Sequence, residues 1–185
     1  METIDRGAFV DPGAAPMAFE DCVLPIACGQ VIPRPVVVGQ ILQSLKLQTV
    51  REARILLVGA GSGYLAALAA QLGADVFAVE RYRRLADTTR NRVQHLGLTN
   101  IAIKQDDGLD GWSERGPFDR IVLAGAIDEV PDVLMEQLTK DGALIAPMLD
   151  GEGPHILRIS AEGVRERLQL IEALPRLVAG RSQAL

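Results

Sequence analysis

A short stretch in the first half of the chain decides which architectures are open to it. Residues 54–58 contain four consecutive apolar positions, which is typical of a buried strand. Three glycines fall within residues 59–63, so a tight turn with almost no side-chain bulk follows, and the Ala- and Leu-rich run at 64–72 then favours a helix. A strand, a glycine turn and a helix in this order can hold a nucleotide-like ligand at the carboxyl edge of a parallel sheet. The glycines let the ligand approach the backbone, and N–H groups at the helix start can donate to it.

The spacing of the glycines distinguishes between ligands. A dinucleotide fingerprint requires a third glycine where this chain has Tyr64, and the observed order is Gly59-x-Gly61-x-Gly63. That order resembles motif I of the class I S-adenosylmethionine (AdoMet) methyltransferases. An NAD-dependent oxidoreductase is therefore disfavoured, whereas a glycine-rich turn without a ligand stays open until further residues are considered.

The pattern on both sides of the turn alternates strand and helix. The predicted strands are 54–58, 75–79, 100–104, 118–123 and 143–147, and the predicted helices are 35–47, 64–72, 83–96 and 131–138. A turn is expected at 141–142. Two further strands at 156–160 and 167–174, joined by a turn at 161–163, suggest an antiparallel hairpin. The prediction is an α/β fold: a Rossmann-like, mostly parallel doubly wound sheet with a C-terminal antiparallel hairpin.

Composition and N-terminal sequence limit the function classes. The chain has 185 residues, 48% hydrophobic content and a net charge of −5, which argues against disorder and against general affinity for nucleic acid. No apolar run reaches the roughly 18 residues that a membrane span needs, and the N-terminus lacks a signal-peptide pattern. The two cysteines and two histidines have no metal-ligand spacing, so no metal site is predicted. We expect a cytoplasmic protein, as a monomer or weak dimer.

The first 34 residues lack a regular pattern. Residues 1–16 are rich in Gly, Ala and Pro and are predicted to form a loop or an extended arm. Residues 17–34 are apolar but interrupted by Pro25, Gly29 and Pro33. A hydrophobic loop of this kind has to lie against another part of the molecule, and a ligand site is one candidate.

Polar and small residues follow three of the predicted strands. Glu80 ends one strand, where a carboxylate can accept both ribose hydroxyls; the alternative is a charge at the start of the next helix. Asp107 can accept from an adenine amino group while Gly108 leaves room for the ring, although an ordinary Asp-Gly turn is the alternative. Ala124 leaves space after another strand. The predicted cofactor-binding residues are Gly59, Ala60, Gly61, Ser62, Gly63, Tyr64, Glu80, Arg81, Asp107, Gly108 and Ala124.

Motifs along most of the chain resemble the protein-L-isoaspartate O-methyltransferase family. They are Phe19-Glu-Asp, Leu24-Pro-Ile, the loop Gly29-Gln-Val-Ile-Pro-Arg-Pro35, Val58-Gly-Ala-Gly-Ser-Gly-Tyr64, Val79-Glu-Arg81, Asp107-Gly108 with Gly111-Trp112, Pro117-Phe-Asp119 and Glu129-Val-Pro131. The resemblance implies a single methyltransferase domain over residues 1–185, with residues 1–34 as an N-terminal arm and acceptor loop. It also implies AdoMet as methyl donor and repair of isoaspartyl residues in damaged proteins.

The chain departs from the family on the acceptor side. Pro33 and Val31 stand where the family has a serine and a threonine, Arg34 replaces a glutamine, and the usual N-terminal helix has no counterpart before Arg6. Gln30 and Arg34 are the predicted substrate-binding residues. Arg34 is expected to pair with an acceptor carboxylate, or else to point to solvent.

The departures leave alternatives open for the function. The chain is expected to be a carboxyl O-methyltransferase acting on isoaspartyl proteins or on another carboxylate acceptor. The alternative is a non-catalytic AdoMet-binding homologue. A carboxylate with a pKa of about 4 is already ionised at neutral pH, so methyl transfer to it needs no general base. No catalytic residue is therefore predicted.

Overall fold

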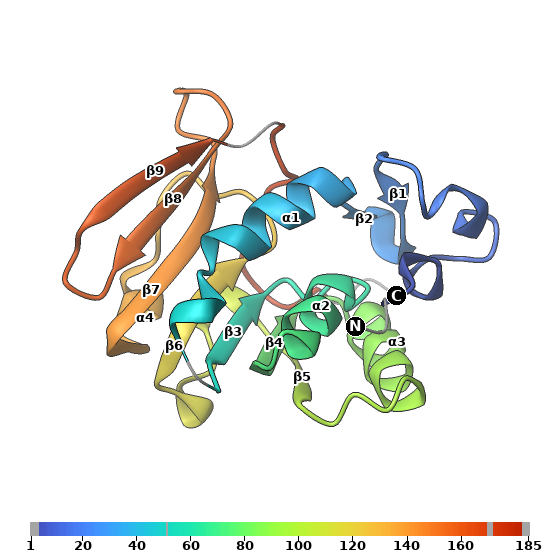
Figure 1. The fold of residues 1–185 in the computed structure, drawn as a ribbon, viewed down its shortest axis with the longest axis horizontal. Coiled ribbons are helices and arrows are strands. Elements are labelled where there is room, and N and C mark those ends of the chain that lie inside the picture. Colours follow the sequence, from blue (N-terminus) through green and yellow to red (C-terminus); the bar gives the residue numbers. More distant parts are fainter. Residues whose placement is uncertain (1–3, 51, 170–171, 183–185) are drawn as a thin grey trace.

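The computed structural model describes residues 4–50, 52–169 and 172–182. Its centre is a seven-stranded sheet in the order β5-β4-β3-β6-β7-β8-β9 (Figure 1). The strands are β3 (Arg54–Val58), β4 (Asp75–Glu80), β5 (Ile101–Gln105), β6 (Phe118–Leu123), β7 (Leu138–Met148), β8 (His155–Ser160) and β9 (Arg165–Gln169). The first five are mutually parallel, and β8 and β9 extend the sheet as an antiparallel hairpin. This confirms the predicted fold class.

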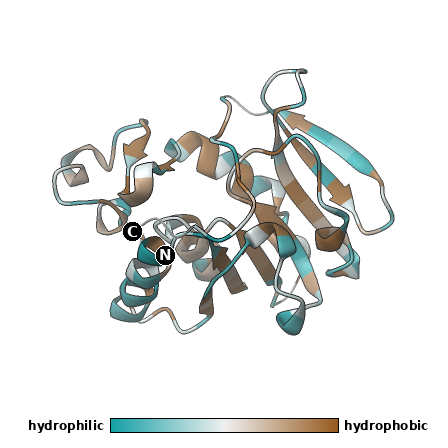
Figure 2. Cartoon of the chain, turned by 180° about the vertical axis from the view of Figure 1, so that it is seen from behind, coloured by the Kyte–Doolittle hydropathy of each residue, from teal (hydrophilic) through white to brown (hydrophobic). Residues whose placement is uncertain are grey.

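Helices cover both faces of the sheet. They are α1 (Pro35–Ser44), α2 (Tyr64–Gln71), α3 (Arg83–His95) and the short α4 (Asp132–Met135). Successive side chains of a strand point to opposite faces. Accordingly, Ile55 and Leu57 pack with α1 and α2, whereas Leu56 and Val58 pack in a second cluster that includes Leu134 of α4. Burial on both faces explains the continuous apolar run in β3, and Figure 2 shows the central strands in brown and α3 mostly in teal.

The N-terminal segment, residues 4–34, differs from the expected loop or extended arm. It contains the 3-10 turns η1 (Arg6–Phe9), η2 (Ala15–Met17) and η3 (Ala27–Gly29), and the small hairpin of β1 (Leu24–Pro25) and β2 (Val31–Ile32). Phe9 is fully buried, and its ring centroid lies 5.4 Å from that of Tyr64 in α2. The segment thus packs in a small apolar cluster that it shares with α2. It packs at the opposite end of the molecule from the β8–β9 hairpin (Figure 1).

Three predicted boundaries are wrong around β7 and β9. The expected helix 131–138 spans only Asp132–Met135, and the expected turn at 141–142 lies inside β7, beside a register shift between β6 and β7. A Cβ on Gly142 would come within 2.9 Å of Thr139 O, so the Asp-Gly pair serves an irregularity of the strand. Strand β9 begins at Arg165, two residues before the prediction, and ends at Gln169; residues 170–171 lie outside the described part.

The residues that the structure describes lack membrane-spanning helices and metal-binding clusters. None of their helices is both long and apolar enough to cross a membrane. Nor do they contain a group of three or more His, Cys, Asp or Glu side chains able to hold a metal ion.

Candidate functional site

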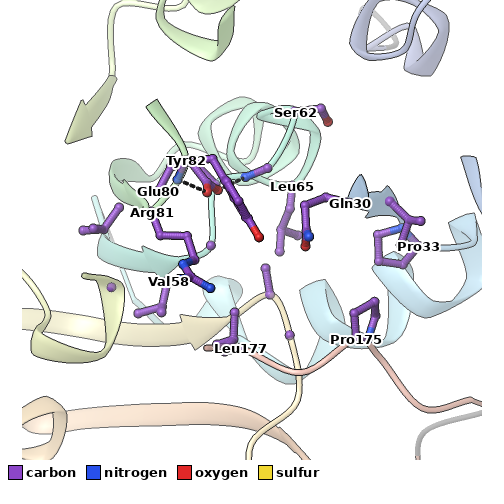
Figure 3. A pocket seen from close by; sticks show the side chains of 18 of the residues that line it. Gln30, Pro33, Val58, Ser62, Leu65, Glu80, Arg81, Tyr82, Pro175 and Leu177 are labelled. Carbon is purple, nitrogen blue, oxygen red and sulfur yellow. Dashed lines mark hydrogen bonds between the residues drawn. The ribbon is translucent and has the colours of Figure 1, made fainter. Parts of the chain in front are cut away.

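A pocket lies at the carboxyl ends of β3, β4, β5 and β6, where the sequence places the glycine turn and the acidic residues. Its empty volume is about 1080 Å³, part of which is open solvent. The lining comes from six stretches of chain, within residues 30–41, 58–65, 79–82, 107–109, 124–125 and 175–178. Figure 3 shows Gln30 and Pro33 on one side and Glu80 and Arg81 on the other.

The structure brings nearly all predicted site residues to this one pocket. Ten of the eleven predicted cofactor-binding residues line it, and so does Gln30. Gly63 does not line it; with φ +90° it caps the start of α2 instead, where a Cβ would meet Thr89 Cγ2 at 2.7 Å. Arg34 is also absent from the lining. The grouping is a finding of the structure, whereas the contacts of each residue with a ligand stay predictions.

Glu80 is the charged centre of the pocket. Its side chain is buried, at 4% exposure, and its Oε2 and Oε1 accept hydrogen bonds from the N–H groups of Gly61 (2.8 Å) and Tyr82 (2.9 Å). Burial raises the pKa of Glu80 above its usual range, and these backbone donors partly oppose that rise. Each carboxylate oxygen has a second acceptor position, so the group can still receive hydroxyl donors from a ligand.

The glycine turn offers fewer donors than its sequence suggests. Four of its N–H groups are used inside the chain: Gly59 and Ala60 donate to Val79 O, Gly61 to Glu80 and Gly63 to Ala60 O. These bonds fix the turn beside β4. The turn therefore contributes mainly space for a ligand.

Asp107 and Gly108 form the wall at the end of β5. Asp107 Oδ1 accepts from Leu109 N at 2.9 Å and caps the turn η5 (Gly108–Asp110). A Cβ on Gly108 would come within 2.7 Å of Val58 Cγ1, so a larger residue would push into the strand that carries the glycine turn. The Asp-Gly turn is thus present, and it faces the pocket.

The C-terminal strap, residues 175–182, closes the pocket from a direction that sequence reasoning missed. Pro175 to Val178 line the pocket, and Gly180 N donates to Asp107 Oδ2. Arg81 Nε donates to Gly180 O at 3.0 Å, and Ser182 N donates to Arg81 O at 3.1 Å. Hydrogen bonding to Arg181, and then to Lys104, holds the pKa of Asp106 well below its usual range. The strap has no hydrophobic periodicity, so no sequence signal marked it.

The N-terminal wall, residues 30–33, faces the strand ends across the pocket. Its side chains at Val31 and Pro33 are apolar, and the amide of Gln30 donates to Cys28 O at 3.3 Å. Arg34 follows the wall, but its guanidinium donates to Asp21 Oδ2 at 3.1 Å and to Glu172 Oε2 at 3.4 Å. Pairing of Arg34 with an acceptor carboxylate stays a prediction, and it would require the side chain to leave these partners.

Comparison with known proteins identifies the family to which the chain is similar. A sequence model described as protein-L-isoaspartate(D-aspartate) O-methyltransferase (PCMT) matches residues 1–167. A protein-L-isoaspartate O-methyltransferase of Rhodopseudomonas palustris is 39% identical in an alignment of 188 positions that covers 96% of this chain and 84% of the relative. One from Azorhizobium caulinodans is 43% identical over 148 residues, covering 80% of this chain and 67% of the relative.

Solved structures agree on the fold. A structure titled protein-L-isoaspartate O-methyltransferase has a TM-score of 0.78 at 24% identity and covers 94% of this chain and 59% of the other. A Plasmodium falciparum methyltransferase structure in complex with S-adenosyl-L-homocysteine has a TM-score of 0.76 at 21% identity, with 94% and 85% covered. At such identities the likeness shows the fold alone. The match of the sequence model over most of the chain shows more: the chain belongs to the protein-L-isoaspartate(D-aspartate) O-methyltransferase family.

Proposed function

We propose that the pocket binds AdoMet and that the chain methylates the free carboxylate of isoaspartyl residues in damaged proteins. Membership of the family supports an AdoMet-dependent O-methyltransferase. The observation that carries the proposal is the buried Glu80, which is bonded to the glycine turn and shares one pocket with Asp107 and Gly108. Side chains at consecutive strand ends beside a glycine turn form the arrangement that receives a nucleoside in open α/β sheets.

The chemistry of the lining fits AdoMet. Glu80 would accept the ribose hydroxyls with the acceptor positions that the backbone leaves open. Asp107 would accept from the adenine amino group, and Gly108 would lie flat against the ring. The turn at 59–61 and Ala124 would leave room for the methionine part. Gly63 would act indirectly, by setting the start of α2.

Methyl transfer from AdoMet to a carboxylate needs no general acid or base from the protein. When bound, AdoMet supplies a methyl group on a positively charged sulfur. An acceptor carboxylate is already ionised at neutral pH, so the chain's residues need only align it and exclude water. The apolar side chains of Val31, Pro33 and Leu177 suit that task. Charge is lost as the two groups combine, so a dry enclosure favours the transition state over the separated charges.

The acceptor contact is proposed for Gln30. Val31 and Pro33 offer no hydroxyl, whereas the Gln30 amide lies in the lining and has a second N–H besides the one that it gives to Cys28 O. The apolar N-terminal wall also favours a second candidate function. In that reading, the acceptor is a different acidic molecule or catalysis is lost while AdoMet binding is kept.

The deciding experiment measures transfer of labelled methyl from AdoMet to an isoaspartyl peptide, with the matching normal Asp peptide as control. We expect base-labile label on the isoaspartyl peptide alone. AdoMet binding is measured in the same sample by calorimetry. Binding without transfer would refute the isoaspartyl acceptor and support the second candidate. Absence of binding would refute the assignment of the pocket.

Domain organisation, location in the cell and oligomeric state are also proposed. Residues 1–185 are proposed to form one methyltransferase domain that acts in the cytoplasm as a monomer or weak dimer. The single pocket-bearing sheet of the described residues supports the first point. Sedimentation of the purified chain would test the oligomeric state directly.

A further inference from the structure

Arg6 is a buried cation whose hydrogen bonds all go to main-chain oxygens. It is 3% exposed, and no carboxylate of the described residues forms an ion pair with it. Its two terminal nitrogens donate to four backbone carbonyls: Ala18 O and Glu20 O at 3.3 Å, Cys22 O at 2.7 Å and Pro33 O at 2.9 Å. Its Nε has no hydrogen-bond partner. Asp21 interacts with Arg6 electrostatically, but no carboxylate of the described residues bonds the guanidinium, and burying a charge in this way is costly unless hydrogen bonds compensate for it.

The contacts of Arg6 join two parts of the N-terminal segment that are distant in sequence. One guanidinium nitrogen holds both Cys22 O and Pro33 O, and the other holds the turn at residues 18–20. Pro33 is part of the N-terminal wall and lines the pocket, whereas Arg6 itself does not. Arg6 therefore fixes one end of the wall without touching the space that a substrate would occupy.

Arg6 shares the support of the N-terminal wall with a few other contacts, among them the hydrogen bonds of Asp21 with Arg34 and with Val36 N just after the wall. The wall's other backbone contacts are the two-residue pairing of β1 with β2 and the hydrogen bonds from Ile26 N to Gln30 O at 2.9 Å and from Gln30 N to Ala27 O at 3.3 Å, and the buried side chain of Ile32 packs in the apolar cluster of the segment. A two-stranded pairing of this length is marginal by itself. The planar guanidinium can reach several carbonyls at fixed angles, which a lysine ammonium cannot reproduce.

We propose that Arg6 is a positioning residue for the methyl acceptor: it acts through Pro33 and sets where the N-terminal wall stands relative to the cofactor pocket. This rests on the proposed function, since it assigns the wall to the acceptor side. A displacement of reacting groups by about 1 Å can lower a rate about a hundredfold, so a loose wall would be felt in acceptor turnover and much less in AdoMet binding.

Arg120 provides a matched control for the test. It is also 3% exposed, and it donates to Leu45 O at 2.7 Å, to Asp119 O at 2.6 Å and to Thr49 Oγ1 at 3.2 Å. It thus ties down the chain after the C-terminal end of α1, whereas Arg6 holds the chain before its N-terminal end. Arg120 does not line the pocket.

The experiment compares Arg6→Lys and Arg6→Gln with Arg120→Gln, using the isoaspartyl peptide and AdoMet. We expect kcat/KM for the peptide to fall at least about tenfold in both Arg6 variants, more in Gln than in Lys, with the AdoMet Kd within about twofold of wild type. Arg120→Gln should lower Tm while leaving the peptide KM within about twofold. The proposal is overturned if the Arg6 variants change peptide kinetics no more than Arg120→Gln does, measured where all are folded.

A second readout does not depend on turnover. Amide hydrogen exchange at residues 30–32 should be faster in Arg6→Lys than in wild type and Arg120→Gln, while exchange in β3 stays unchanged. If the wild type methylates no isoaspartyl peptide, the proposed function fails, and the exchange comparison then decides alone. Unchanged exchange at residues 30–32 would overturn the role of Arg6. Should Arg6→Gln not fold, Arg6→Lys carries both measurements.

Discussion

The two sides of the pocket are built by different means. The strand-end side is formed by the ends of β3 and β4. The β3 residues Leu56, Leu57 and Val58 are at most 1% exposed, so the core of the sheet holds this side in place. The N-terminal wall consists of a two-residue strand and its neighbours, held by the hydrogen bonds of Arg6. A site made this way can change its acceptor contacts while its cofactor contacts persist. A related division appears in the sequence: family motifs occur on both sides, but the departures Val31, Pro33 and Arg34 all lie at or beside the N-terminal wall.

The largest expected effect is on the strand-end side. Glu80→Ala removes the acceptor for two part-buried N–H groups, those of Gly61 and Tyr82, together with the carboxylate proposed to bind the ribose, and should raise the AdoMet Kd about thirtyfold, or about 2 kcal/mol. Asp119→Ala is the control, because Asp119 accepts from Arg54 N at 2.9 Å near the opposite ends of the strands. Equal AdoMet affinities in the two variants, measured by calorimetry, would erase the distinction between the sides.

Acid should weaken AdoMet binding through the same residue. The pKa of Glu80 is raised by burial above the ordinary 4.5, so protonation and loss of affinity should begin above pH 4.5 as the pH falls. The raised pKa of Glu80 affects the stability of the fold in the opposite direction, since acid favours the folded chain. A raised folded-state pKa contributes stability below the unfolded pKa, and this is lost as pH rises through the folded pKa. AdoMet Kd against pH should therefore flatten in Glu80→Gln; a wild-type midpoint below pH 4.5 would contradict this.

The start of α2 should be intolerant of a methyl group. Gly63→Ala combines a φ of +90° with a Cβ 2.7 Å from Thr89 Cγ2, and should cost about 2–3 kcal/mol of unfolding free energy. Gly73→Ala has a φ of +93° with nothing within 4 Å and should cost only about 1 kcal/mol. Urea unfolding of both variants measures the difference, and equal losses would mean that the contact with Thr89 relaxes at no cost.

Changes on the N-terminal wall should be smaller and confined to the acceptor. Restoring the family's hydroxyls with Val31→Thr and Pro33→Ser should lower the peptide KM about fivefold, which is about one hydrogen bond. AdoMet Kd and Tm should stay close to those of the wild type. A Kd that moves as much as the KM would show that the two sides are coupled.

The smallest effect is expected at Arg34. Its ion pairs with Asp21 and Glu172 are partly exposed, and solvent-exposed pairs of this kind contribute little. Arg34→Ala should therefore change the peptide KM less than about fivefold, and Asp21→Asn should behave alike. A much larger KM increase in Arg34→Ala alone would instead establish the direct contact with an acceptor carboxylate that the sequence suggested.

Elements that are determined by neighbouring residues in the chain could be predicted from the sequence. The run 55–58 is apolar because both faces of β3 are buried, and Glu80 could be placed because it ends a strand beside the turn. Prediction from the sequence failed at Gly142, since an Asp-Gly pair suits a turn and a strand irregularity equally well.

Other features depend on partners far along the chain. The fold of residues 4–34 depends in part on Arg6, which donates to carbonyls up to 27 positions away, and carbonyls carry no sequence signature. The strap is similar, because Arg181 meets Asp106 across 75 positions. Arg34 looked available for a ligand until Asp21 and Glu172 were seen beside it.

The C-terminal strap also gives the pocket a place from which its loading can be observed. The chain's one tryptophan, Trp112, lies outside the pocket lining, so its fluorescence is a poor reporter of ligand. Val178 is 56% exposed yet belongs to that lining, and two residues later the strap is anchored to the strand ends. A dye or spin label attached there would sit at the rim of the pocket, on a tether short enough to sense whether the site is filled.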